Sequence, residues 1–352
     1  MFMKYFLSII AASIILFNQV NAENHEYVKS FMDKYRNGHL FHSYNIPIKT
    51  QINSLLTYPN SQSHDIFCFI GDTGGGGKQQ RDAASLLVYH SQKNIKDHCD
   101  QTHLLGDIIY PVGIQEADGG KRVKELFFDI YKNLLGPNRP PIYLAFGNHD
   151  YYGSVEKWFE YAANYPNLKI PYYFYAEKIN DLCLVTIDTN PIYEQGWHSK
   201  DIPRYHQHME WYERIHPQLS ACRFKVLLGH HPHISARESD MALKIFYEKY
   251  IEGKFDLIIS GHDHLLSYMG ARNGTHMFVS GGGGKEIREK AKNEAIEAKK
   301  KGIIKWVSFN PGILKMKVHR QNGALKKVDI YSIIQTNIGA KVEKRVSLFP
   351  RR

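Results

Sequence analysis

The chain has 352 residues, a formal net charge of +10 at pH 7, 43% hydrophobic residues and 23% charged residues. This length exceeds that of a minimal domain and suffices for one large α/β core, and the fractions are those of an ordinary globular protein. The excess of Lys and Arg fits an anionic ligand or surface, and it fits plain solubility equally well, because net charge speaks to association and not to fold.

The first residues have the pattern of a signal peptide. Lys4 gives a positive start, residues 6–17 are apolar apart from two serines, and small residues lead up to Ala22. The apolar run is shorter than the roughly 20 residues that a bilayer span needs, and no later stretch is long and apolar enough. We therefore predict a signal peptide over 1–22 rather than an uncleaved anchor, and a soluble protein that is secreted or periplasmic, with no stable membrane span.

Residues 23–64 are mixed polar and aromatic, and we expect an N-terminal arm there. From residue 65 short apolar runs alternate with helical patterns, which is typical of βα units around a covered sheet, and no linker divides 65–352. Two late runs, 312–318 and 324–333, are predicted strands of a second sheet. The βα strands are predicted over 65–72, 102–107, 141–150, 181–190, 224–232 and 255–264, and the helices over 78–93, 121–135, 155–165, 206–219 and 242–252.

A charged helix is predicted over 285–301. Glu286 with Lys290, and Glu297 with Lys301, have the favourable i,i+4 order, so we expect a solvated face rather than a binding helix.

The four cysteines allow three full pairings, and the sequence does not choose among them. The absence of a CxxC motif argues against a thiol redox site or a cysteine zinc knuckle. Cys68, Cys183 and Cys222 lie in or beside apolar runs, where we expect buried free thiols, although export would allow disulfides that also include Cys99.

Five of the predicted strands end in the same way, with an apolar run, a glycine, and then a side chain able to bind a metal ion. The glycine lets the backbone turn sharply and approach a site closely, and open α/β sheets bind ligands at the carboxyl ends of their strands. We therefore expect the five ends to converge. Their polar residues are Asp72 in GDTG, Asp107 and Tyr110 in GDIIY, Asn148 and His149 in GNHD, His230 in GHHP, and His262 and His264 in GHDH.

These donors are too many for one tetrahedral zinc ion and suit two ions that share a carboxylate, as in sites for phosphoryl displacement. Oxygen and imidazole donors without thiolate favour Fe, Mn or Zn. Each motif alone has a structural explanation, such as a tight turn at GDTGGGG, a turn-forming Asn148 or a core His230. GDTGGGG also lacks the Lys-Ser/Thr ending of a Walker A loop, which argues against an NTPase. Five such ends together favour a metal centre.

In this order the motifs resemble those of the calcineurin-like metallophosphoesterases. With Tyr110 included, they are similar to the small, tartrate-resistant-acid-phosphatase-like branch of the purple acid phosphatases. The segments VGIQEAD and PYYFYAEK add to the likeness, which covers roughly residues 65–335. The resemblance implies an α/β fold, a two-sheet metallophosphoesterase sandwich flanked by helices, in a single catalytic domain over 65–352.

The resemblance also implies a dinuclear centre. Asp72, Tyr110 and His264 would hold Fe(III), and Asp107 would bridge to Fe(II), Zn or Mn held by Asn148, His230 and His262. A phenolate is a hard anionic ligand suited to Fe(III), so we expect Tyr110 to be a ligand and not a core aromatic.

The implied activity is that of an acid phosphatase that hydrolyses small phosphate monoesters and does not act on nucleic acid. A metal-bound hydroxide would attack phosphorus, and His149 would protonate the leaving oxygen. The chain departs from the family pattern at Ile108, where relatives often have Asn. His231 and His233 lie closer to the fourth motif than the substrate-facing histidine of relatives, so neither is assigned a catalytic role.

Two alternatives stay open. A metallophosphoesterase loaded with Mn or Zn would act on diesters or nucleotides with the same ligands. A non-catalytic phosphatase-fold scaffold protein would usually have lost ligands, whereas this chain keeps them. The natural substrate, the divalent ion and the oligomeric state stay open as well.

Overall fold

The structure is a computed structural model that describes residues 55–57, 65–92, 95–195, 203–235 and 240–351. The predicted signal peptide and most of the predicted N-terminal arm lie outside these residues. No helix within the described ranges is long and apolar enough to cross a membrane.

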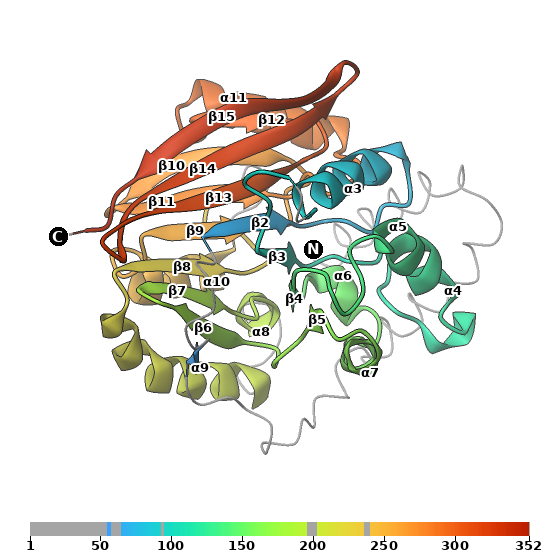
Figure 1. The fold of residues 1–352 in the computed structure, drawn as a ribbon, viewed down its shortest axis with the longest axis horizontal. Helices are drawn as coiled ribbons and strands as arrows, with labels where there is room; N and C mark the ends of the chain where they lie inside the picture. The colour runs from blue at the N-terminus through green and yellow to red at the C-terminus, as the bar shows by residue number, and fades with distance from the viewer. Residues whose placement is uncertain (1–54, 58–64, 93–94, 196–202, 236–239, 352) are drawn as a thin grey trace, which may run out of the picture. The chain divides into compact units, whose positions relative to one another are not determined.

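Two β-sheets pack face to face, with helices on their outer sides (Figure 1). The eight-stranded sheet has the order β1-β6-β7-β8-β9-β11-β10-β12, and the seven-stranded sheet the order β15-β14-β13-β2-β3-β4-β5. This confirms the predicted two-sheet α/β sandwich. The strands of the first sheet are Leu56–Thr57 (β1), Tyr175–Ile179 (β6), Leu182–Thr186 (β7), Phe224–Leu228 (β8), Leu257–Ser260 (β9), Leu266–Arg272 (β10), Thr275–Ser280 (β11) and Trp306–Ser308 (β12). Those of the second are Ile66–Ile70 (β2), Gln101–Leu105 (β3), Ile142–Ala145 (β4), Leu168–Lys169 (β5), Gly312–Gln321 (β13), Ala324–Thr336 (β14) and Gly339–Leu348 (β15).

The helices follow the predicted order, and their ends differ by a few residues. The element predicted over 121–135 is α4, a π-helical turn (η4) and α5 in succession, and it already ends at Tyr131. The helical segments are Lys78–His90 (α3), Glu116–Asp118 (η3), Lys121–Val123 (α4), Lys124–Phe128 (η4), Asp129–Tyr131 (α5), Asn148–Tyr151 (α6), Glu156–Asn164 (α7), Asn190–Gln195 (α8), Pro203–Ile215 (α9), His216–Ala221 (η5), Met241–Phe246 (α10), Tyr247–Ile251 (η6) and Glu289–Lys300 (α11).

The hydrophobic core lies between the two sheets. Phe67 and Phe69 of β2 and Leu314 of β13 face Phe224 and Val226 of β8, and all five are fully buried in one cluster. Each such side chain stabilises the fold by roughly 1.5–3 kcal/mol relative to exposure. This packing fixes the two sheets against each other and brings the ends of their strands together.

The prediction that the C-terminal strands form a sheet of their own is wrong. β13 pairs antiparallel with β2, with Leu314 opposite Phe69, so β13, β14 and β15 extend the sheet that holds β2, β3 and β4. The βα series instead changes sheet after β5, and the β6–β7 hairpin then joins the eight-stranded sheet, in which β6 also pairs with the earlier β1. Apolar patterning marks a strand, but it does not say which neighbour the strand pairs with.

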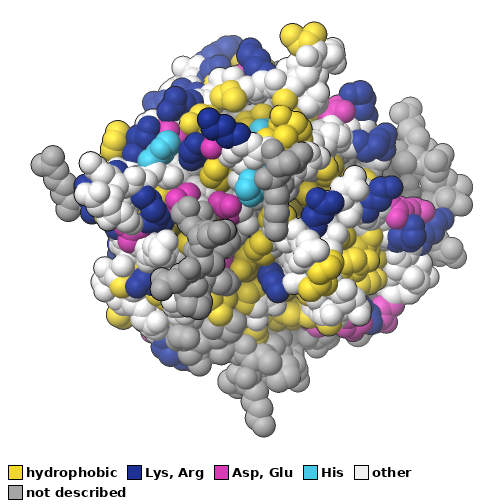
Figure 2. Space-filling model, in the orientation of Figure 1, with side chains coloured by type: hydrophobic (Ala, Val, Ile, Leu, Met, Phe, Trp, Pro, Cys, Tyr) yellow, Lys and Arg dark blue, Asp and Glu magenta, His cyan; other side chains and the backbone are white. Residues whose placement is uncertain are grey.

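The charged helix is shorter than predicted, because it begins at Glu289 and leaves Glu286 outside. The described ion pairs join Lys290 to Glu294, Lys292 to Glu289 and Lys300 to Glu297. Its opposite side buries three alanines, which agrees with an otherwise solvated face: Ala291, Ala295 and Ala298. Elsewhere too, the positive charge is spread out. Figure 2 shows Lys and Arg scattered among other side chains on the face in view.

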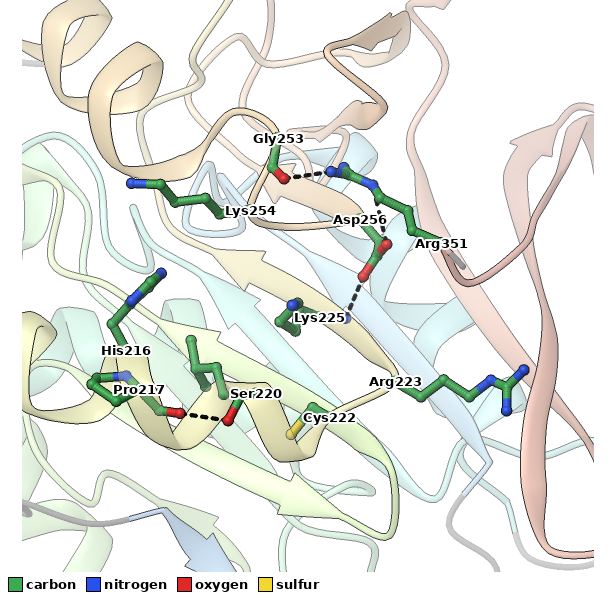
Figure 3. Close-up of a pocket in the computed structure, with 11 residues that line it drawn as sticks. His216, Pro217, Ser220, Cys222, Arg223, Lys225, Gly253, Lys254, Asp256 and Arg351 are labelled. Atoms are coloured by element: carbon green, nitrogen blue, oxygen red, sulfur yellow. Dashed lines mark hydrogen bonds and ion pairs between the residues drawn. The ribbon is translucent and has the colours of Figure 1, made fainter.

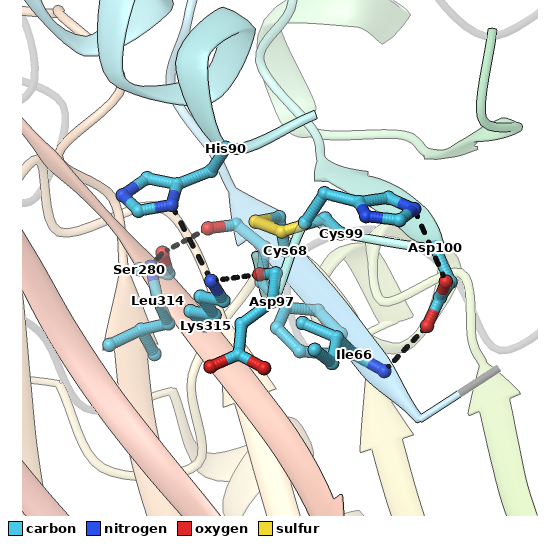
Figure 4. Close-up of a disulfide and its surroundings, with 11 residues drawn as sticks. Ile66, Cys68, His90, Asp97, Cys99, Asp100, Ser280, Leu314 and Lys315 are labelled. Atoms are coloured by element: carbon cyan, nitrogen blue, oxygen red, sulfur yellow. Dashed lines mark hydrogen bonds and ion pairs between the residues drawn. A yellow bond between two sulfur atoms is a disulfide. The ribbon is translucent and has the colours of Figure 1, made fainter. Parts of the chain in front are cut away.

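The interpretation of Cys68, Cys183 and Cys222 as free thiols is wrong. Cys68 bonds to Cys99, and Cys183 bonds to Cys222. Figure 4 shows the first pair joining β2 to the segment before β3, where Asp100 accepts hydrogen bonds from the start of β2. Each disulfide thus joins two segments of the same sheet. The spacing of four cysteines left this pairing open, and the packed fold decides it.

Candidate metal centre

The five predicted strand ends do converge on one place. β2, β3 and β4 of one sheet and β8 and β9 of the other end there, which places Asp72, Asp107, Asn148, His230 and His262 at one edge of the sandwich. Two contacts tie the two sheets together at this edge. His230 Nδ1 donates to the carbonyl of Leu105, and the His262 amide donates to Asp72 Oδ2 at 2.8 Å.

One group of atoms able to bind a metal ion, here called donor atoms, lies around the Tyr110 hydroxyl. This oxygen lies 2.7 Å from Asp72 Oδ1, 2.7 Å from Asp107 Oδ2 and 3.0 Å from His264 Nε2. His264 Nε2 is itself 3.5 Å from Asp72 Oδ1. Four possible metal-binding atoms from three motifs therefore lie within 3.5 Å of a neighbour in the group.

A second group gathers around His230. Its Nε2 lies 3.4 Å from Asp107 Oδ2, 3.2 Å from Asn148 Oδ1 and 3.3 Å from His262 Nδ1. Asp107 contacts both Tyr110 and His230, so its carboxylate lies between the two groups. That is where a bridging ligand would have to be.

Backbone carbonyls orient the histidine rings. His230 Nδ1 donates to Leu105 O at 2.8 Å, and His264 Nδ1 donates to Glu286 O at 3.3 Å, so each ring turns Nε2 towards the other donors. Metal-bound histidines commonly make this second hydrogen bond, because it fixes the tautomer that leaves the ligating nitrogen unprotonated. His149 is held in a similar way. Its Nδ1 donates to Pro111 O and its amide donates to Asp107 Oδ1.

The backbone is strained at the same residues. Asp72 (φ 61°), Asp107 (φ 53°), His262 (φ 71°) and His264 (φ 54°) have left-handed conformations, which are uncommon for residues other than glycine. Such conformations cost on the order of 1–3 kcal/mol each and gather at functional sites. Four of them among the predicted ligands indicate that the fold holds these side chains for a reason other than stability.

Two glycines make the close approach possible. Gly106 has φ 82°, and a Cβ there would lie 2.5 Å from the Gly147 nitrogen. A Cβ on Gly147 would lie 2.2 Å from Asp107 Oδ1. The predicted role of the glycine before each ligand is therefore confirmed at both positions.

The electrostatics of the site favour a bound cation. Asp72, Asp107 and Tyr110 are buried together, and burial with the charges of Asp107 and Asp72 raises the pKa of Tyr110 well above its usual value. Burial lowers the pKa of His230, but the charge and hydrogen bond of Asp107, the charge of Asp72 and the bond to Leu105 O together outweigh this and raise it to about 9. The cluster thus stabilises positively charged groups, and the phenolate form of Tyr110 would be present only beside a cation. Buried carboxylates of this kind are usually paired or bind metal ions, so the donor set fits two metal ions.

Asp150 is a residue of this site that the sequence reasoning missed. It is buried, and its carboxylate accepts backbone N–H groups from Asp107 (2.8 Å), Ile108 (3.0 Å) and Gly147 (2.8 Å). Burial raises the pKa of Asp150, while these N–H donors oppose the rise. Asp150 thereby holds the GDIIY and GNHD turns together. The last letter of GNHD was the available signal.

The two histidines left without a role differ in position. His231 is buried, stacks on Tyr193, and brings a ring nitrogen within 4.8 Å of ligand atoms of His230 and His262. His233 instead pairs with Glu252. Of the two, His231 belongs to the centre.

Lys285 was also missed. It follows the glycine run 281–284, and its amide donates to Asp72 O at 3.0 Å. Its ammonium lies 4.9 Å from the centre of the Tyr110 ring. The sequence placed Lys285 in a solvated helix, whereas the structure places it beside the predicted ligands.

A cavity of about 460 Å³ lies elsewhere, at the amino ends of β8 and β9 (Figure 3). Lys225, Asp256 and Arg351 line it, and it includes none of the predicted metal ligands.

Comparison with known proteins identifies the family of this chain. Residues 66–266 match the calcineurin-like phosphoesterase family. Tartrate-resistant acid phosphatase type 5 of Homo sapiens is 27% identical over 198 residues, which cover 51% of this chain and 59% of that protein. Purple acid phosphatase 4 of Arabidopsis thaliana is 24% identical over 260 residues, which cover 67% and 73%. The chain thus spans about three fifths of the length of the first curated relatives it matches.

Solved structures show the same fold. GAP50, described as the anchor in the inner membrane complex of Plasmodium, has a TM-score of 0.59 and 18% identity, covering 82% of this chain and 89% of that one. The purple acid phosphatase PPD1 from yellow lupin (Lupinus luteus) seeds has a TM-score of 0.54 and 15% identity, covering 82% and 54%. The predicted resemblance is confirmed, and the chain belongs to the calcineurin-like phosphoesterase family.

Proposed function

We propose that this protein is a dinuclear acid phosphatase that hydrolyses small phosphate monoesters. One observation carries the proposal. Two buried carboxylates, a phenol, an amide and three imidazoles from both sheets meet with their donor atoms 2.7–3.5 Å apart. Structural cores avoid such a gathering of unneutralised acids, whereas a metal centre requires it.

The two groups of donors suggest two ions. Asp72, Tyr110 and His264 would hold Fe(III), and Asn148, His230 and His262 would hold Fe(II), Zn or Mn, with Asp107 between them. Bound ions of this kind lower the pKa of coordinated water and neutralise charge on the phosphoryl group. The orienting hydrogen bonds of His230 and His264 prepare their Nε2 atoms for such ions.

His149 is proposed to donate a proton to the leaving oxygen. The His149 amide donates a hydrogen bond to Asp107, and its ring donates one to the carbonyl of Pro111, so the imidazole is fixed next to the proposed bridging carboxylate. The centre of its ring lies 4.4 Å from the centre of the Tyr110 ring. An imidazole held in this way is suited to proton transfer. Burial lowers the pKa of His149, and the charge of Asp107 and the hydrogen bond to Pro111 O oppose this.

The visible absorption spectrum of the purified protein tests the proposal. We expect a broad purple-to-pink band from a tyrosinate bound to Fe(III), and we expect Tyr110→Phe to remove it. Tyr175→Phe is the matched control, because it removes another buried tyrosine hydroxyl, one that donates to Leu144 O on β4. A band that survives in Tyr110→Phe would refute the role of Tyr110.

A colourless but active protein would favour the first alternative, a Mn or Zn enzyme for diesters or nucleotides. Metal analysis together with a panel of monoesters, diesters and nucleotides separates the two. The second alternative is a scaffold, and the structure named GAP50 is described as an anchor. The complete donor set of this chain argues against it, and a folded, metal-free preparation that binds a partner would restore it.

Export of this enzyme is part of the proposal. The signal-peptide pattern of residues 1–22 predicts a mature chain that starts at Glu23. N-terminal sequencing of the protein recovered from outside the cytoplasm tests this, and an intact Met1 there would contradict it.

A further inference from the structure

Lys285 lies at the rim of the proposed centre. Its amide is tied to Asp72 O, and its ammonium lies 4.9 Å from the centre of the Tyr110 ring. The side chain is partly exposed, so its charge can meet a ligand that enters from solvent. Within the described ranges, no carboxylate oxygen lies within ion-pair distance of the Lys285 ammonium.

Two arginines add positive charge beside Lys285. Arg288 follows three residues later, directly before α11, and Arg122 belongs to α4. Burial lowers the pKa of Lys285 and the charges of Arg288 and Arg122 lower it further, while the charges of Glu286 and Asp107 oppose this.

Packing explains why α4 is near. Gln80 of α3 donates to Leu126 O at 2.6 Å, one turn after Arg122. Gln80 also touches the glycine run, since a Cβ on Gly284 would lie 2.2 Å from its Cα. Gln80 therefore fixes η4 against the segment that carries Lys285.

We propose that Lys285, Arg288 and Arg122 form an anion-binding subsite for a second anionic group of the substrate, next to the phosphate that reacts. The proposal rests on the proposed phosphatase function. Metal ions at the proposed centre would meet the reacting phosphate, so further cations at the rim suit substrates with a second phosphate, such as diphosphate esters. Complementary charge of this kind selects among ligands more than it adds to catalysis.

Calorimetric titration with imidodiphosphate and with inorganic phosphate tests the subsite. Lys285→Gln should weaken imidodiphosphate binding by roughly tenfold and phosphate binding by less than about threefold, because one facing charge is lost. Lys285→Arg should retain most of the binding. Lys290→Gln, an exposed lysine of α11, is the matched control and should change neither.

Steady-state kinetics provide a second test of the subsite. With a diphosphate ester, Lys285→Gln should raise KM and leave kcat nearly unchanged, while metal content and the visible band stay as in the wild type. Equal weakening of both ligands, or no weakening of either, overturns the subsite. A wild type that holds no metal ions overturns the proposed function itself, and the subsite with it.

Discussion

The buried carboxylates at the two ends of β8 and β9 have different kinds of neighbours. At the amino ends, Asp256 Oδ2 accepts from the Lys225 amide at 2.8 Å, and its other oxygen lies 3.4 Å from Arg351, which also donates to Gly253 O (Figure 3). The Asp256 carboxylate there is paired with a backbone N–H and a guanidinium. At the carboxyl ends, Asp72 and Asp107 crowd the same hydroxyl, and both have left-handed backbones.

The difference separates a structural polar cluster from a functional one. A buried carboxylate that is paired with a cation is compatible with a stable fold. Buried carboxylates that lie close to one another are stabilised by binding an additional cation. Exposure does not distinguish the two, since Asp256 and Asp107 are both buried. The arrangement of partners does, and the two ends should therefore respond differently to substitution.

The largest effect is expected at the carboxyl ends. Asp107→Ala should abolish metal loading and phosphatase activity together, because the carboxylate lies between both groups of donors. Metal analysis and an activity assay measure this, with Asp256→Asn as the control at the other end. Normal occupancy of both metals in Asp107→Ala would refute the bridging role.

His149→Ala should keep the metal ions but slow the reaction. Loss of a positioned proton donor typically costs 10²–10⁴-fold, and poor leaving groups should suffer most because they need the proton. Rates for a series of aryl and alkyl phosphates measure this dependence. Equal loss across the series would count against proton donation.

A third buried carboxylate, Asp329 of β14, resembles the amino-end cluster and should affect stability alone. Burial would raise its pKa, but Ser347, Lys327 and Arg345 hold the pKa well below its usual range. An acid whose pKa is lowered by folding stabilises the fold at pH values above the pKa that it has in the unfolded chain. This stabilisation is lost as the pH falls towards the pKa that it has in the folded protein. Asp329→Asn should therefore cost about 1–2 kcal/mol at pH 7 and less at pH 3.

Urea unfolding of Asp329→Asn and the wild type at both pH values gives the comparison. A cost that is the same at pH 3 and pH 7 would show that the charge of Asp329 is not what stabilises β14.

The smallest effect is expected for Arg351→Gln. Its partly exposed guanidinium contributes less than about 1 kcal/mol, and kcat/KM should not change. Thermal unfolding and a standard assay check both. A loss of activity would show that the two ends are coupled and would break the comparison.

The sequence predicted where the polar strand ends meet better than it predicted the pairing of strands. Asp72, Asp107 and His262 each follow a local pattern of strand, glycine and polar side chain, and local patterns survive folding. The pairing of β13 with β2 and that of Cys68 with Cys99 join distant segments, which no local pattern encodes.

Other features were missed for related reasons. In β15, at the edge of its sheet, charged residues are interspersed with small apolar ones, so the sequence has no apolar run that would predict the strand. Lys285 acquires its place only through tertiary packing, and its neighbours in sequence gave no sign of it.

The two disulfides each join segments of one sheet, and neither joins one sheet to the other. The proposed ligands come from both sheets, so metal ions bound there would act as the missing cross-link. Because only the closed sandwich assembles the site, mass action would couple the free metal concentration to folding. Above saturation, each tenfold rise would add about 1.4 kcal/mol to the free energy of unfolding for each ion. A chelator would then act as a denaturant that loosens the two sheets from each other.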